Sequence, residues 1–84
     1  MAPISYDDAL ARNLALIERV CKKSAVENSR FVEDLELDSV DLVGLISDME
    51  EEFGVIVPEE KLHSIRTVAD ATQCICDLAR ENVA

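Results

Sequence analysis

The sequence predicts an all-α fold: a four-helix bundle with a long loop after the first helix and a short third helix. Apolar residues make up 49% of the 84 residues but aromatic residues only 4%, so the core has to be built from aliphatic side chains. Apolar residues also recur at helical spacing in three segments, and each segment follows a residue that can cap a helix. A chain of this length holds one core, so we expect residues 1–84 to form a single domain.

The first helix is predicted to begin after Ser5, whose side chain can cap it, with Asp8 in the first turn. The apolar residues of the first helix recur at intervals of four, three and four positions, which predicts one buried stripe: Leu10, Leu14, Ile17 and Cys21, with Val20 beside it.

The segment after the first helix, residues 24–38, shows no sustained periodicity and is predicted to form a long loop. Phe31 and Leu35 are expected to anchor this loop to the core.

The second helix is predicted to begin after Asp38, a good capping residue, with Asp41 three positions on. Gly54 is well placed to end this helix, because glycine readily adopts the left-handed conformation found there. The predicted apolar stripe of the helix is Val40, Val43, Ile46, Met49 and Phe53, widened by Leu42 and Leu45.

A short helix and a final long helix are predicted for the rest of the chain. Pro58 suits the first turn of a helix over residues 58–64. Thr67 and Asp70 have the spacing of a capping box, which predicts the start of the last helix. That helix is expected to end near Asn82, and its predicted buried stripe is Val68, Ala71, Ile75 and Leu78.

The net charge of −10 is concentrated in the middle of the chain. Residues 31–60 contain 11 acidic residues and no basic residue, whereas residues 1–30 contain four acidic and five basic residues. Such a field repels nucleic acid and anionic membranes and attracts proteins with basic patches. The alternative is that these acids serve solubility alone.

The cysteines and the N-terminus indicate the cytoplasm. The chain has three cysteines, an odd number, and its N-terminus lacks the pattern of a signal peptide. The uncharged apolar runs are far shorter than the roughly 20 residues of a membrane span. We therefore expect a cytoplasmic monomer that neither inserts into membranes nor binds nucleic acid.

No metal site is expected from the cysteines and the histidine. Cys74 and Cys76 are two positions apart on a predicted helix, so their side chains point in different directions. Cys21 is remote in sequence from both of them, and His63 has no zinc-site spacing to any cysteine.

A calcium-binding EF-hand loop is excluded by two positions. Asp34, Glu36 and Asp38 match the alternating oxygen ligands that begin such a loop. The sixth position, which requires glycine, is Ser39, and the twelfth, which requires a glutamate, is Leu45. The acidic run is therefore not predicted to hold calcium in this way.

Ser39 is the remaining candidate for chemistry. A serine at a helix start is usually only a cap. Here it follows a long loop and begins the most acidic helix, so we expect its hydroxyl to face solvent. A phosphate ester at that position would meet the positive end of the helix dipole but would be repelled by Asp38 and Asp41.

Three segments together resemble the signature of the acyl carrier protein family: FVEDLELDSVDLVGL at 31–45, EEEFGVIVPEE at 50–60 and TVAD at 67–70. The resemblance covers residues 31–80 closely and the first helix by pattern only. It implies that a phosphopantetheinyl transferase attaches 4'-phosphopantetheine from coenzyme A to Ser39, beside Asp38. The thiol of this cofactor would hold acyl groups as thioesters, and the carrier itself would catalyse nothing.

The resemblance also implies two surfaces for partners and cargo. Acidic residues would meet basic patches on the transferase and on acyl-transfer and synthase enzymes: Asp38, Asp41, Glu50, Glu51, Glu59 and Glu60. An acyl chain could be sheltered among core positions that would serve equally well as ordinary core: Phe31, Leu45, Met49, Val57, Leu62, Ile65 and Ala71.

The expected pathway is fatty acid biosynthesis, with alternatives left open. The chain departs from the family pattern at Val40, Gly44, Lys61, Leu62 and His63. The alternative is a specialised carrier for a polyketide, peptide, lipid or cell-wall pathway, which would tolerate these departures more easily. Two further alternatives are an acidic interaction subunit that is never loaded, and a small hydrolase that uses Ser39 with His63 as its base.

Overall fold

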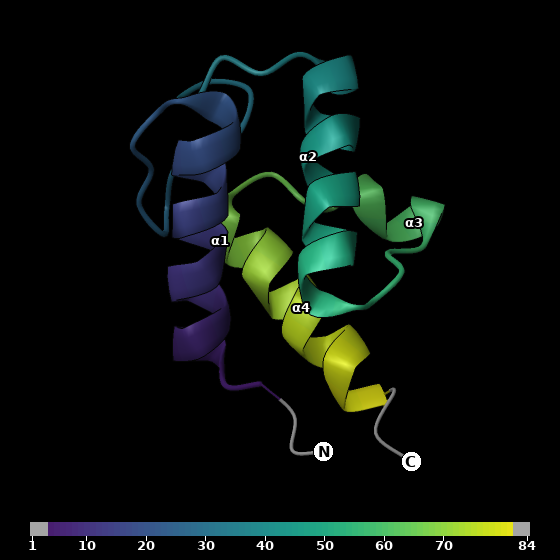
Figure 1. The fold of residues 1–84 in the computed structure, drawn as a ribbon. Coiled ribbons are helices and arrows are strands. Elements are labelled where there is room, and N and C mark those ends of the chain that lie inside the picture. The colour runs from purple at the N-terminus through teal and green to yellow at the C-terminus, as the bar shows by residue number, and fades with distance from the viewer. Residues whose placement is uncertain (1–3, 82–84) are drawn as a thin grey trace.

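The computed structural model describes residues 4–81, and this part of the chain contains four helices (Figure 1). They are α1 (Tyr6–Cys21), α2 (Ser39–Phe53), α3 (Glu59–Leu62) and α4 (Val68–Glu81). Residues 22–38 form the long loop, which pairs with the start of the last helix through an isolated bridge between Arg30 and Thr67. The all-α fold, the long first loop and the short third helix are therefore confirmed. The predicted helix end near Asn82 lies outside the described residues.

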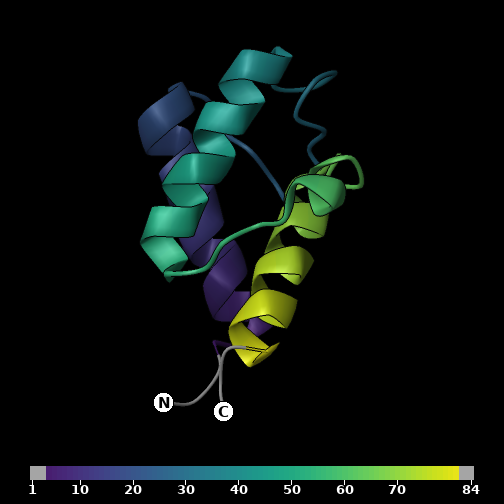
Figure 2. The same cartoon turned by 90° about the vertical axis from the view of Figure 1, so that its right-hand side faces the viewer.

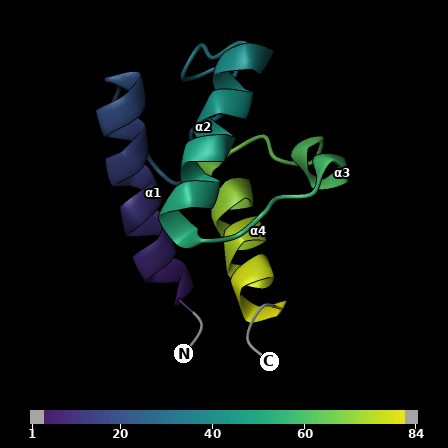
Figure 3. The same cartoon turned by 45° about the vertical axis from the view of Figure 1, so that its right-hand side comes forward.

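The helices α1 and α2 lie side by side and run in opposite directions, and α4 crosses them at an angle (Figures 1 and 3). The helix α1 packs against both α2 and α4. The short α3 stands to one side, on the segment that returns from the end of α2 to the start of α4 (Figure 2). It is shorter than the predicted 58–64, and none of its residues is fully buried.

The helix ends follow the capping residues that the sequence predicts. Gly54 ends α2 with φ of 67°, a left-handed conformation that glycine adopts without strain. Three helix starts carry the predicted side-chain caps: Asp8 N–H donates to Ser5 Oγ (3.2 Å), Asp41 N–H to Asp38 Oδ1 (2.7 Å) and Asp70 N–H to Thr67 Oγ1 (3.1 Å).

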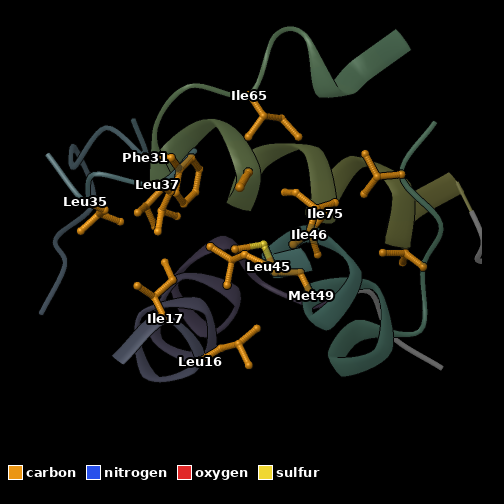
Figure 4. Close-up of a cluster of buried hydrophobic side chains, with 14 of the residues drawn as sticks. Leu16, Ile17, Phe31, Leu35, Leu37, Leu45, Ile46, Met49, Ile65 and Ile75 are labelled. Carbon is orange, nitrogen blue, oxygen red and sulfur yellow. The ribbon is translucent and has the colours of Figure 1, made fainter. Parts of the chain in front are cut away.

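The core draws buried side chains from three helices, the long loop and the α3 segment (Figure 4). Phe31 and Leu35 are buried, at 0% and 3% exposure, and anchor the loop as predicted. Phe31 N–H also donates to the carbonyl of Arg66 (2.9 Å), which joins the loop to the residues before α4. The core residues are Leu16, Ile17, Phe31, Leu35, Leu37, Leu45, Ile46, Met49, Val55, Val57, Ile65, Val68, Ala71, Ile75 and Leu78.

The predicted stripe of α2 is wrong at its first two positions. Val40 is 79% exposed and Val43 is 55% exposed. At about 100° per residue these two valines share one face, while Leu45, Ile46 and Met49 share a face more than a quarter-turn away. The helix is apolar on both faces, so the packing against α1 and the rest of the core selects the buried one.

The predicted stripe of α1 is correct at Ile17 but misses its most buried neighbours. Ala9 and Asn13 are both fully buried, although one is small and the other polar. Leu10, Leu14 and Cys21 pack at the margin of the core, and Val20 is 44% exposed. Apolar periodicity therefore located one edge of the buried face and not its centre.

Candidate functional site

Ser39 is the first residue of α2, and it does not cap that helix. Asp38 occupies the cap position in an extended conformation, with φ of −86° and ψ of 179°, and its carboxylate accepts Asp41 N–H at 2.7 Å. Ser39 is exposed, and its hydroxyl makes no hydrogen bond to any residue that the structure describes. The capping role that usually explains a serine at this position is therefore taken by its neighbour.

The loop before Ser39 is held in place over several residues. Leu37 is buried, and its N–H donates to the carbonyl of Phe31 at 3.0 Å. Lys23 Nζ donates to the carbonyl of Leu35 at 2.5 Å, which ties the loop to the end of α1. Glu36 has a positive φ of 58°, so the chain turns sharply just before the site. These contacts place the start of α2 without using the Ser39 side chain.

The electrostatic surroundings of Ser39 are mixed. The first turn of α2 exposes backbone N–H groups, which favour an anion. The exposed carboxylates of Asp38 and Asp41 have the opposite effect. A phosphate ester on Ser39 would thus be attracted by the helix end and repelled by its two acidic neighbours, which favours projection into solvent.

The acids predicted to meet partners fall into two groups. Asp41, Glu51, Glu59 and Glu60 are exposed, like Asp38. Glu50 is partly buried instead, and its Oε2 accepts the backbone N–H of Val57 at 2.7 Å. No sequence signal marked this bond, because it joins a helix to a segment with no periodicity.

The residues predicted to shelter an acyl chain lie together in the core. Phe31, Leu45, Met49 and Ile65 can be followed in Figure 4, where they point into one cluster. Leu62 is partly buried and packs against the cluster from α3. Leu62 is the exception among the seven predicted positions, and the other six are buried: Phe31, Leu45, Met49, Val57, Ile65 and Ala71.

A groove of about 380 Å³ lies elsewhere, between α1 and α2. Its lining includes Leu16 and Val20 from α1 and Asp48 and Glu51 from α2, with Arg19 and Glu52 completing it. None of these except Glu51 was predicted as a site residue. The groove escaped sequence reasoning because it depends on how the two helices pack side by side.

The other reactive side chains form no catalytic arrangement with Ser39 in the described part of the chain. His63 is exposed at the end of α3, and no hydrogen bond joins it to Ser39 within residues 4–81. Burial raises the pKa of the Cys21, Cys74 and Cys76 thiols, which keeps them in the protonated, less nucleophilic form.

Within residues 4–81, no three His, Cys, Asp or Glu side chains gather as metal ligands. In the same part of the chain, no helix is long and apolar enough to cross a bilayer.

Comparisons with known proteins identify what this chain is similar to. A family model described as a phosphopantetheine attachment site matches residues 14–75. An acyl carrier protein of Lactobacillus acidophilus is 45% identical over 56 residues, covering 67% of this chain and 70% of that protein. An acyl carrier protein of Zymomonas mobilis subsp. mobilis is 46% identical over 50 residues, covering 60% of this chain and 64% of that protein.

A solved structure gives the same result for the fold. It is that of a Mycobacterium tuberculosis protein proposed to be an acyl carrier protein. The two structures agree with a TM-score of 0.70 at 27% sequence identity. The match covers 84% of this chain and 95% of that one, so it includes most of the helical architecture.

Proposed function

Because the chain belongs to the acyl carrier protein family and therefore carries covalent 4'-phosphopantetheine, we propose that Ser39 is the attachment residue. The observation that carries this proposal is the division of roles at the start of α2: Asp38 caps the helix, and the Ser39 hydroxyl stays exposed without a described hydrogen-bond partner. When bound, the cofactor supplies a thiol that can hold an acyl group as a thioester. Residues 1–84 would act as a single carrier domain.

The residues around Ser39 fit such an attachment. An exposed hydroxyl on a fixed helix start can enter the active site of another enzyme, whereas a buried one could not. In the loading step, Ser39 Oγ attacks the phosphorus that bears pantetheine in coenzyme A, the phosphoanhydride bond breaks, and the nucleotide leaves. No described side chain bonds to the hydroxyl to accept its proton, so the transferase has to supply the base.

The partners we propose are a phosphopantetheinyl transferase and acyl-transfer and synthase enzymes with basic patches. Asp41 and Glu51 on α2 and Glu59 and Glu60 on α3 are exposed, and the structure describes no ion pair for any of them. Exposed charges of this kind accelerate encounter and set orientation more than they add affinity. Weak contacts suit a carrier that has to leave each enzyme quickly.

The pathway we propose is cytoplasmic fatty acid biosynthesis, with a specialised polyketide, peptide, lipid or cell-wall pathway as the second candidate. One observation favours the second candidate: Leu62 of α3 packs against the core cluster, where its bulk reduces the room for a long acyl chain. Loading the protein with acyl groups of increasing length and measuring its thermal stability separates the two. A long-chain carrier gains stability as the chain lengthens, and a carrier for short or polar groups does not.

Intact-mass spectrometry tests attachment at Ser39. The protein is incubated with coenzyme A and a promiscuous phosphopantetheinyl transferase, and the mass is expected to rise by one phosphopantetheinyl group. Ser39→Ala should show no gain, whereas Ser47→Ala, which removes another exposed α2 hydroxyl, should be loaded normally. Failure to load folded wild-type protein with several transferases would favour an acidic interaction subunit that is never loaded.

A further inference from the structure

The segment between α2 and α4, residues 54–67, contains α3 and is called the connector below. Its first part alternates in burial: Val55 and Val57 are 4% and 8% exposed, whereas Ile56 between them is 81% exposed. Two apolar side chains thus hold this part against the core. The helix α3 that follows has only four residues, no side-chain cap and no fully buried residue.

Glu50 makes most of the hydrogen bonds between α2 and the start of the connector. Its backbone carbonyl accepts Gly54 N–H at 2.8 Å and Val55 N–H at 3.2 Å. Its carboxylate reaches further and accepts Val57 N–H at 2.7 Å. The Glu50 carboxylate is thus the hydrogen-bond partner that the structure gives for the N–H of Val57. Val57 is buried, and a buried N–H without a partner is unfavourable.

The other end of the connector is held in a similar way. Asp70 Oδ2 accepts Arg66 N–H at 3.0 Å and Thr67 N–H at 3.1 Å. Between these two attachments, the described hydrogen bonds of residues 58–65 stay within the connector. Only apolar packing, chiefly by Ile65 and partly by Leu62, holds this middle part to the core.

We propose that Glu50 is a positioning residue whose carboxylate, through Val57 N–H, holds the connector closed over the apolar core. This gives Glu50 a role different from that of its exposed neighbour Glu51. A basic group of a partner that attracted the Glu50 carboxylate would release Val57 N–H and loosen the connector. The connector residues Val57 and Ile65 are buried in the same core cluster as Met49 of α2, so loosening the connector would open a route to that cluster.

The consequence for cargo rests on the proposed carrier function. An acyl chain on Ser39 can enter the core only where a covering segment can move aside. The connector is the candidate segment, because α1 packs against both α2 and α4, whereas α3 has only four residues and none of them is fully buried.

Amide hydrogen exchange measured by NMR on unloaded protein tests the role of Glu50. In Glu50→Ala, exchange of the Val57 amide should rise about tenfold or more, with smaller increases over residues 58–65 and no change in α1 or α4. Glu50→Gln keeps an acceptor oxygen and should retain most of the protection. Glu51→Ala and Glu51→Gln are matched controls on an exposed neighbour and should resemble wild type.

Equal Val57 exchange in wild type and Glu50→Ala would overturn the proposal. So would equal loosening in Glu50→Gln and Glu50→Ala, because charge rather than the hydrogen bond would then matter. The comparison needs no cofactor, so it decides the role of Glu50 even if Ser39 cannot be loaded.

A second comparison tests the cargo. Both variants are loaded with an octanoyl group as a thioester on the cofactor and treated with hydroxylamine. The thioester should be cleaved faster in Glu50→Ala than in Glu50→Gln, because a looser connector shelters the octanoyl chain less well. Equal cleavage would overturn the link to cargo and leave the exchange result unaffected.

Discussion

Asn13 and Thr72 form a fully buried hydrogen bond between α1 and α4, in which Asn13 Nδ2 donates to Thr72 Oγ1 at 2.9 Å. Thr72 Oγ1 in turn donates to the carbonyl of Val68 at 2.8 Å. Asn13 Oδ1 has no hydrogen-bond partner among the described residues. The pair fixes how α1 and α4 align, but it leaves one buried acceptor unsatisfied.

Thr72→Val should destabilise the protein by about 1–3 kcal/mol, because it leaves the buried Asn13 amide without its acceptor. Replacing both partners, as Asn13→Leu with Thr72→Val, should restore most of the loss, since no polar group then remains unpaired. Urea unfolding of the two single variants and the double variant measures this. Additive losses in the double variant would show that the two side chains do not depend on each other.

The pKa of Glu52 should lie below the usual value of a glutamate, and Arg12→Ala should raise it. Arg12 Nη2 donates to Glu52 Oε2 at 2.7 Å and to the Glu52 carbonyl at 2.9 Å, and the guanidinium lies 4.5 Å from the centre of the Phe53 ring. The hydrogen bond from Arg12 and its charge lower the Glu52 pKa. Carbon-detected NMR titration of the carboxyl groups measures it.

The sign of the pH dependence follows from that lowered pKa. A carboxyl group with a lowered pKa in the folded state stabilises the fold above the unfolded pKa of about 4.3, and this stabilisation is lost as the pH falls through the folded pKa. Wild type should therefore lose more stability on acidification than Arg12→Ala. Parallel acid-unfolding curves for the two proteins would contradict this.

Tyr6 should ionise at unusually high pH. Its hydroxyl donates to Glu27 Oε2 at 2.5 Å, and this hydrogen bond, together with burial and the Glu27 charge, raises the Tyr6 pKa to about 12. The interaction is fully present below the unfolded pKa of about 10 and is lost as the pH rises through the folded pKa. Tyr6 is the single tyrosine of the sequence, so tyrosinate absorbance reports it directly. Glu27→Gln should shift the titration back toward the usual value.

Salt and divalent cations should stabilise the fold. Residues 31–60 hold 11 acids and no base. In the described part of the chain, Glu33, Asp34, Glu36 and Glu52 form ion pairs with Arg12, Lys23 or Arg30. The others repel one another across solvent, and ions screen this repulsion. The melting temperature should rise with added NaCl and with Mg²⁺. For a domain of this size, a rise of about 4–8 °C corresponds to ~1 kcal/mol of added stability. A melting temperature that neither salt changes would contradict the expectation.

Sequence reasoning succeeded where local chemistry decides the structure. Ser5, Asp38 and Thr67 cap helices because their side chains reach backbone N–H groups three positions away, an effect that needs no tertiary contact. Gly54 ends α2 for a similarly local reason. The position of Ser39 just inside a capped helix could therefore be predicted from residues 38–41 alone.

Sequence reasoning failed where packing decides between equivalent faces. Val40 and Val43 are as apolar as the buried residues of α2, and only the position of α1 and the loop shows that they face solvent. Asn13 was overlooked because a polar residue is rarely fully buried without a partner, and that partner is 59 positions away. Glu50 was grouped with its acidic neighbours because its bond to Val57 depends on the path of the connector.

Locating the cofactor in the loaded protein decides whether Ser39 is the attachment residue. After incubation with coenzyme A and a phosphopantetheinyl transferase, fragmentation mass spectrometry of the tryptic peptide spanning residues 31–61, which contains both Ser39 and Ser47, reads the modified position. We expect the phosphopantetheinyl group on Ser39, with Ser47 and Ser64 unmodified. A loaded protein whose modification lies at any other residue would contradict this expectation.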